Sequence, residues 1–141
     1  MATLQIDCGD LLFALGSHDT ENYLDLKTGV VVPIFADLLD DEQPELDLED
    51  EERYRFIEPV PSHEGFEWME SFARRQQDGR VRADLLAALE RRRPFRSVKD
   101  ALASYPEVRT RWFEFEEERL LQYAREWLLG EGIQAELVVP A

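Results

Sequence analysis

The sequence has little of the chemistry that most catalytic and metal sites require. Its 141 residues include one cysteine and two histidines, which are Cys8, His18 and His63. A single cysteine cannot form an internal disulfide, and the three residues are not at the spacing of a zinc-ligand set. Phosphate-binding loops and nucleophile motifs are also missing. We therefore expect no cofactor and no metal, and we lean against an enzyme, although 31 acidic residues leave acid/base chemistry open.

Long apolar runs are missing as well. No stretch is apolar over the length that a membrane span needs, and the amino terminus lacks the basic and apolar segments of a secretion signal. Together with the single cysteine, this predicts a cytoplasmic protein that does not bind membranes. A length of 141 residues with 44% hydrophobic content is typical of one folded unit, so we expect residues 1–141 to form a single domain.

Positive charge is scarce and unevenly distributed. The chain has 16 basic against 31 acidic residues, a net charge of −15. Residues 36–52 hold ten acidic residues and no basic one, which predicts a hydrated acidic loop because like charges at this density repel. Residues 74–99 hold nine basic and three acidic residues. Local charge, rather than the net charge, then decides what each region attracts.

The hydrophobic pattern predicts an α+β fold. A hairpin is expected at residues 21–35 with Gly29 in its bend, a third strand at residues 53–58 and a fourth strand after Gly132. These strands suggest one small antiparallel sheet packed with about five helices, the longest near the C-terminus. The helices are expected from Asp7 to Gly16, from Ser62 to Asp78, from Arg80 to Arg93, from Ser97 to Ser104 and from Pro106 to Leu129.

Capping and turn residues set these helix limits. Asp7 and Ser62 are expected as N-caps, and Ser97 with Asp100 has the spacing of a capping box. Pro94 is expected to end the third helix, which places the three arginines before it in its last turn. In the longest helix the recurring apolar positions predict a wide buried stripe made of Val108, Trp112, Phe113, Phe115, Leu120, Ala124, Trp127 and Leu128.

Two stretches together resemble a bacterial family that is known only as an uncharacterised protein family. One is the hairpin LDLKTGVVV at residues 24–32, and the other is the helical end PFRSVKDALASYPEVRTRWFEFEEERLLQYAREWL at residues 94–128. The residues that fall where the family pattern places them are Phe95, Arg96, Lys99, Asp100, Leu102, Pro106, Trp112 and Trp127. The resemblance implies a compact bacterial cytosolic domain and carries over no activity, substrate or catalytic residue.

Recognition is the function that the charge pattern favours. We expect first a protein-binding module that docks acidic residues onto a partner with a basic surface, with Trp68, Trp112 or Tyr123 as anchors. A homodimer that joins the acidic half of one copy to the arginine-rich segment of another is a variant. The candidate partner-binding residues are Asp40, Asp41, Glu42, Glu49, Asp50 and Glu51 on the acidic side and Arg91, Arg92, Arg93, Arg96 and Lys99 on the basic side.

Two alternatives use the same residues differently. Nucleic acid could bind the arginine-rich segment at residues 74–99, with Phe95 and Tyr105 stacking on bases. Alternatively, the acidic surface could act as a DNA mimic that inhibits a nucleic-acid-binding protein. The sequence leaves both alternatives open beside the protein-binding module.

Overall fold

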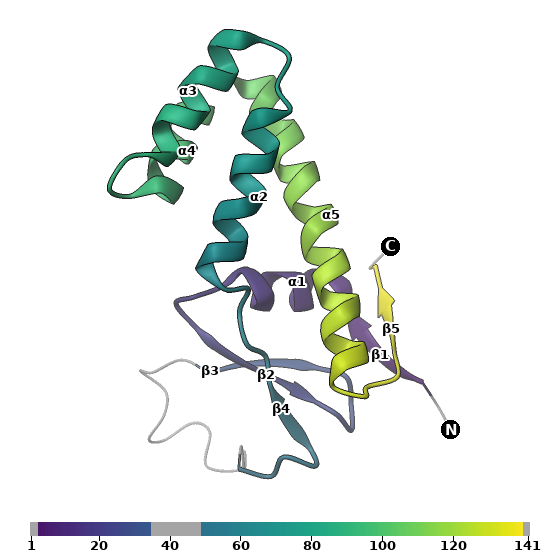
Figure 1. Ribbon diagram of the computed structural model, residues 1–141. Coiled ribbons are helices and arrows are strands. Elements are labelled where there is room, and N and C mark those ends of the chain that lie inside the picture. The colour runs from purple at the N-terminus through teal and green to yellow at the C-terminus, as the bar shows by residue number, and fades with distance from the viewer. Residues whose placement is uncertain (1–2, 35–48, 140–141) are drawn as a thin grey trace. The chain divides into compact units, whose positions relative to one another are not determined.

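The computed structural model describes residues 3–34 and 49–139, and the chain forms two compact units (Figure 1). Unit 1 comprises Met1–Pro59 and Leu120–Ala141, and unit 2 comprises Val60–Arg119. The predicted α+β class is confirmed, with five helices and two small sheets among the described residues and the longest helix, α5 (Pro106–Gly130), near the C-terminus. The single domain stays a prediction. Most of the expected acidic loop lies outside the described residues.

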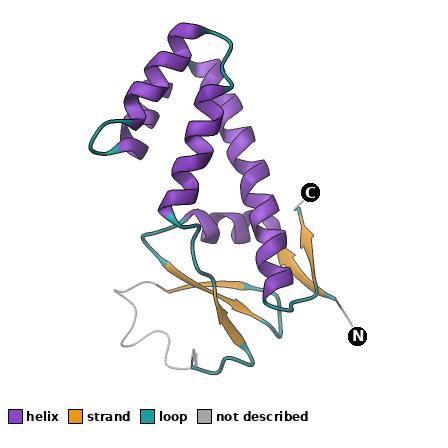
Figure 2. Ribbon diagram, in the orientation of Figure 1, coloured by secondary structure: helices purple, strands orange, loops and turns teal. Residues whose placement is uncertain are grey.

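Unit 1 contains the predicted hairpin and third strand as one antiparallel sheet. β2 (Glu21–Asp25) pairs with β3 (Val31–Ile34) on one side and with β4 (Tyr54–Phe56) on the other, in the order β3-β2-β4 (Figure 2). Leu24 is fully buried and lies opposite Val31 and Arg55. Since side chains alternate along a strand, Tyr23 and its partner Phe56 lie together on the opposite face.

The C-terminal strand is present, but it belongs to a second sheet. β5 (Ala135–Val138) pairs in parallel with β1 (Leu4–Asp7), so it does not join the antiparallel sheet as expected. β1 was not predicted from the sequence. The strand has four residues and runs directly into α1 (Cys8–Gly16), so it is too short for an alternating pattern to be recognised. α1 itself is capped as predicted, because the Asp7 carboxylate accepts a hydrogen bond from the Asp10 N–H at 2.9 Å.

The hairpin bend lies against β1. Gly29 has a φ of +82°, as its place in the bend predicted, and a Cβ at this position would lie 2.1 Å from the Gln5 carbonyl oxygen. That distance is far below a van der Waals contact, and the backbone conformation is one that side chains disfavour. Glycine is therefore required here for two independent reasons.

Unit 2 is helical and has its own core. It consists of α2 (Ser62–Arg74), α3 (Gly79–Leu89), α4 (Pro94–Leu102) and the first part of α5. Phe72 of α2 and Trp112 of α5 meet edge to face, with ring centroids 5.4 Å apart. The buried cluster contains Met69, Phe72, Ala73, Val81, Leu85, Ala88, Leu89, Val98, Leu102, Val108 and Trp112.

The turns of unit 2 differ from the prediction. Ser62 does not cap α2, because the N-cap is Pro61 and no side chain provides a capping hydrogen bond. α2 ends at Arg74, and Asp78 caps α3 instead by accepting from the N–H groups of Arg80 and Val81. An Asp-Gly pair can end one helix or start the next. Here the free N–H groups at the start of α3 donate hydrogen bonds to the Asp78 carboxylate.

The predicted boundary between α3 and α4 was also wrong. α3 ends at Leu89, and Pro94 starts α4 rather than ending α3. N–H groups in the first turn of a helix have no intrahelical acceptor, so the lack of an N–H in proline costs nothing there. Ser97 therefore lies inside α4 and forms no capping box. In α5 the predicted limits are confirmed to within one residue, but Phe113 is 50% exposed because it lies beside the buried stripe of Val108 and Trp112.

Candidate functional site

The predicted acidic residues that the structure describes gather at the start of β4. Glu49, Asp50 and Glu51 are exposed in the turn that leads into this strand, whereas Asp40, Asp41 and Glu42 lie outside the described residues. Asp50 closes the turn. Its carbonyl oxygen accepts from the N–H groups of residues 53 and 54, and its side chain accepts from that of residue 52. The turn that carries these exposed residues is therefore fixed by hydrogen bonds of Asp50.

Both arginines of this region are neutralised within unit 1. Arg53 approaches Asp25 at 3.3 Å, and Arg55 approaches Glu131 at 3.5 Å. In contrast, three exposed carboxylates on either side of β4, those of Glu51, Glu52 and Glu58, form no ion pair with any described residue. We refer to residues 49–58 as the acidic edge. It presents carboxylates, and its own cations are already engaged.

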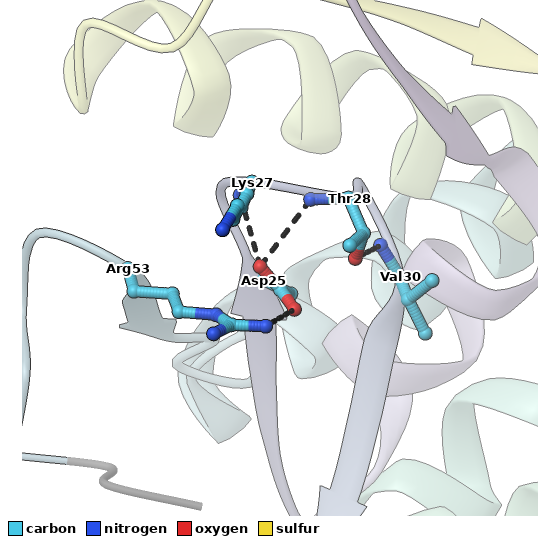
Figure 3. A network of polar contacts seen from close by, with 5 residues as sticks. All are labelled: Asp25, Lys27, Thr28, Val30 and Arg53. Atoms are coloured by element: carbon cyan, nitrogen blue, oxygen red, sulfur yellow. Dashed lines mark hydrogen bonds and ion pairs between the residues drawn. The ribbon is translucent and has the colours of Figure 1, made fainter.

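Asp25 organises the hairpin bend behind the acidic edge. Its buried carboxylate accepts hydrogen bonds from the N–H groups of Lys27 at 2.9 Å and Thr28 at 3.3 Å as well as from Arg53 (Figure 3). Burial by itself raises the pKa of Asp25, but the hydrogen bonds from Lys27, Arg53 and Thr28 together outweigh it, so the pKa is lowered. The hydrogen bond between Arg53 and Asp25 also raises the pKa of Arg53.

An exposed aromatic ring lies in the middle of the acidic edge. Phe56 is 42% exposed and contacts Tyr23 across the strands, with ring centroids 5.4 Å apart. The anchors expected from the sequence are less accessible, because Trp112 is 3% exposed and Trp68 and Tyr123 are half-buried. Sequence reasoning missed Phe56 because alternation along a strand does not tell which face meets the core.

The predicted basic residues lie in unit 2. Arg91, Arg92 and Arg93 are exposed in the turn between α3 and α4, and Arg96 and Lys99 are exposed on α4. We call these five residues the basic turn. Within residues 3–34 and 49–139, none of them forms an ion pair. The five cations lie within nine residues of one another in the sequence, with Glu90 and Asp100 as exposed carboxylates beside them.

The rings proposed to stack on bases are engaged in the packing of unit 2. A Cβ on Gly65 of α2 would lie 3.3 Å from the Phe95 ring, so this ring packs tightly on α2. The Tyr105 hydroxyl donates to the Asp84 carboxylate, and this hydrogen bond is the main cause of the raised pKa of Tyr105. Both rings therefore already have contacts within unit 2.

A depression in the described part of unit 2 includes members of a hydrogen-bond network in its lining. Its volume is about 1110 Å³, and it lies between the end of α2 and α5. The side-chain amide of the buried Gln76 donates to the Phe72 carbonyl at 2.9 Å and accepts from Arg111 at 3.4 Å. The backbone carbonyl of Gln76 accepts from Arg82 at 2.8 Å. These groups satisfy one another, which indicates a role in joining the helices.

The described residues contain neither a metal cluster nor a membrane-spanning helix. No group of three His, Cys, Asp or Glu side chains there is placed to hold a metal ion. No helix in the same residues has the length and apolar content to cross a membrane.

The two units differ in charge. Unit 2 has twelve acidic and twelve basic residues, whereas unit 1 has nineteen acidic and four basic residues. The net charge of −15 is therefore carried by unit 1 alone. The acidic edge belongs to this unit, and the basic turn belongs to the unit without net charge.

Comparison with known proteins bears out the resemblance inferred from the hairpin and the helical end. The model of an uncharacterised protein family, UPF0158, matches residues 1–138. UPF0158 protein PA5073 of Pseudomonas aeruginosa is 37% identical over 137 residues, which cover 95% of this chain and 88% of the relative. No solved structure matches the chain.

Proposed function

The chain belongs to the uncharacterised protein family UPF0158, and from its charge distribution we propose that it is a non-enzymatic protein-binding module. In this proposal unit 1 docks onto a partner protein with a basic surface. The observation that carries the proposal is that unit 1 holds nineteen acidic and four basic residues while unit 2 is balanced. A surface with one sign of charge raises the rate of encounter with a partner of the other sign.

The acidic edge supports the proposal at residue level. Its two arginines pair with Asp25 and Glu131, so these two cations are not available to neutralise its exposed carboxylates. Phe56 adds an exposed ring, which lies between Glu52 and Glu58 in the sequence. Interfaces commonly combine a central apolar contact with a charged rim, and an exposed ring flanked by carboxylates supports such a role.

A pull-down with matched charge variants tests the proposal. One variant replaces Glu49, Glu51, Glu52 and Glu58 by Gln in unit 1, and the control replaces the four exposed glutamates Glu107, Glu114, Glu117 and Glu118 by Gln in unit 2. Bacterial proteins captured at low salt are quantified by mass spectrometry. We expect the unit 1 variant to lose the basic proteins that the wild type and the control both retain. Equal capture by all three would refute docking through unit 1.

The same experiment separates the DNA-mimic alternative. A DNA mimic would capture proteins that themselves bind nucleic acid, and an excess of duplex DNA would displace it from them. A partner that is retained in the presence of the DNA supports the protein-binding module instead.

Binding of a nucleic-acid backbone is the second candidate, and it uses the basic turn. The supporting observation is that five exposed cations form no ion pair among the described residues. Unpaired arginines are suited to phosphate, because the guanidinium group can donate two parallel hydrogen bonds to it. The packed rings of Phe95 and Tyr105 argue for phosphate contacts without base stacking, and the salt dependence considered in the Discussion tests this.

A further inference from the structure

β4 is an edge strand whose outward-facing backbone groups can be identified. The Leu26 N–H donates to the Arg53 carbonyl at 2.6 Å, and the Ile57 N–H donates to the Asn22 carbonyl at 2.8 Å. Hydrogen-bonded pairs alternate along an antiparallel ladder, so residues 53, 55 and 57 direct their backbone groups toward β2. The N–H and C=O of Phe56 therefore point away from β2. No described strand pairs with them.

The two edges of the sheet differ among the described residues, because the β3 edge carries a proline at an outward position and the β4 edge carries none. On β3 the corresponding outward position is Pro33, which lies opposite Asn22 and has no N–H to donate. β4 has the sequence Tyr-Arg-Phe, with no proline or lysine. Edge strands are usually blunted by proline, lysine or a covering element, because unpaired backbone groups attract other strands. β4 is thus the edge of this sheet that can accept a further strand.

The surroundings of β4 indicate which kind of strand it accepts. Glu51 and Glu52 precede the strand and Glu58 follows it, and all three are exposed. An added strand would place one side chain beside Phe56 on the same face, because directly opposed residues in a sheet share a face. The chain from Glu52 to Glu58 spans at most about 20 Å, because an extended strand rises about 3.3 Å per residue.

We propose that an extended basic segment of a partner protein adds to β4 as a fourth strand, in the order β3-β2-β4-partner. The segment carries an apolar side chain that contacts Phe56 and has Lys or Arg on both sides, facing the carboxylates of the acidic edge. Backbone hydrogen bonds to Phe56 contribute affinity, and the flanking charges determine which segments bind. This inference rests on the proposed function and specifies its binding mode and its partner chemistry.

A labelled peptide of sequence KRTVFTVRK is the probe, and fluorescence anisotropy gives its affinity for the full chain. A second peptide has Glu at every basic position. A third is N-methylated at its third, fifth and seventh residues, and a fourth at its fourth and sixth residues. Alternate N–H groups of a strand point to opposite edges, so only one methylated set can face β4. We expect a loss of about tenfold or more for the acidic peptide and for one methylated peptide only.

Variants of the chain test the same contact from the other side. Phe56→Pro removes the outward N–H without removing a donor to β2, whereas the control Phe56→Ala keeps this N–H and removes the ring. We expect peptide affinity to fall further for Phe56→Pro, with circular dichroism and thermal melts showing that both variants fold. Glu58→Lys should weaken binding, and the control Glu136→Lys, at an exposed position of β5, should not.

Each outcome decides one of the two proposals. Equal binding of both methylated peptides with clear charge dependence overturns strand addition and leaves charge-steered docking standing. Equal binding of the acidic and the basic peptide contradicts the docking function itself. If the basic peptide does not bind at low salt, strand addition at β4 is overturned, and the pull-down with the unit 1 variant then decides the docking function independently.

Discussion

The Asp25 carboxylate and the Arg53 guanidinium lie 3.3 Å apart, although 28 residues separate them in the sequence. Asp25 ends β2 at the hairpin bend, and Arg53 directly precedes β4 (Figure 3). The carboxylate also accepts from two N–H groups of the bend. One buried acid therefore fixes both the bend and the point at which the acidic edge enters the sheet.

Replacement of Asp25 by Asn should destabilise unit 1 in a pH-dependent way. The pKa of Asp25 is lowered in the folded state, so its charge stabilises the fold above the unfolded pKa near 3.8, and this contribution is lost as pH falls through the folded pKa. We expect a loss of about 1 kcal/mol at pH 7, because hydrogen bonds to a charged acceptor are stronger than those to an amide. Urea denaturation at pH 7, 5 and 3 measures it. An unchanged difference at pH 3 would show that the charge is not the cause; Asp19→Asn, at an exposed position, is the control.

Replacement of Gly29 by Ala should disrupt the hairpin bend. The new Cβ would lie 2.1 Å from the Gln5 carbonyl oxygen, at a backbone φ of +82°. The backbone strain costs about 1–3 kcal/mol, and the steric contact adds to it. Thermal melts followed by circular dichroism check this. Gly130→Ala is the matched control, because no atom lies within 4 Å of its Cβ position, and it should melt at or above the wild-type temperature. Similar melting of both variants would contradict the contact with β1.

Replacement of Glu116 by Gln should stabilise the protein at neutral pH. Burial raises the pKa of this α5 carboxyl, and Lys99 only partly counteracts the rise. For a raised pKa, the stabilising contribution is present below the unfolded pKa of 4.5 and is lost as pH rises through the folded pKa. We expect an increase in Tm of about 2–4 °C at pH 7 and none at pH 4. Glu117→Gln, at an exposed position, should change neither value. A lower Tm for Glu116→Gln at pH 7 would indicate that the charged form is stabilising.

Replacement of Arg91, Arg92 and Arg93 by Ala should weaken binding to single-stranded RNA if the basic turn contacts phosphate. Three lost contacts would reduce the slope of log affinity against log salt by about 2. Anisotropy titrations between about 50 and about 200 mM NaCl measure this slope. The control variant removes three other exposed arginines, Arg74, Arg75 and Arg109. An equal loss in both variants would show that the basic turn has no special role in binding, and no binding by the wild type at low salt would remove the nucleic-acid candidate.

The features predicted correctly are those that depend on neighbouring residues. Pro106 and Gly130 mark the limits of α5 because their backbone properties act at their own positions. Asp7 was identified as a cap because it accepts a hydrogen bond from an N–H only three residues away. Gly29 was placed in a bend for its backbone freedom. In each case the physical cause lies within a few residues of sequence.

The candidate site was predicted less completely. The sequence identified the acidic and basic residues, but it placed Arg91, Arg92 and Arg93 inside a helix that ends at Leu89. It also gave no sign that Phe56 would be exposed or that Arg53 and Arg55 would be neutralised by Asp25 and Glu131. Such partners lie far apart in the chain, and composition and spacing carry no information about which distant residues meet.

The sequence by itself determined the α+β class, the hairpin bend, the extent of α5 and the scarcity of positive charge. These follow from local backbone preferences and from composition, which need no knowledge of the fold. Tertiary structure alone decided that β5 pairs with β1 and that Arg53 and Arg55 are engaged. It also decided that no strand in the described part of the chain pairs with the outer edge of β4. The reason is that strand pairing and ion pairing depend on contacts between residues distant in sequence, and these contacts exist only once the chain has folded.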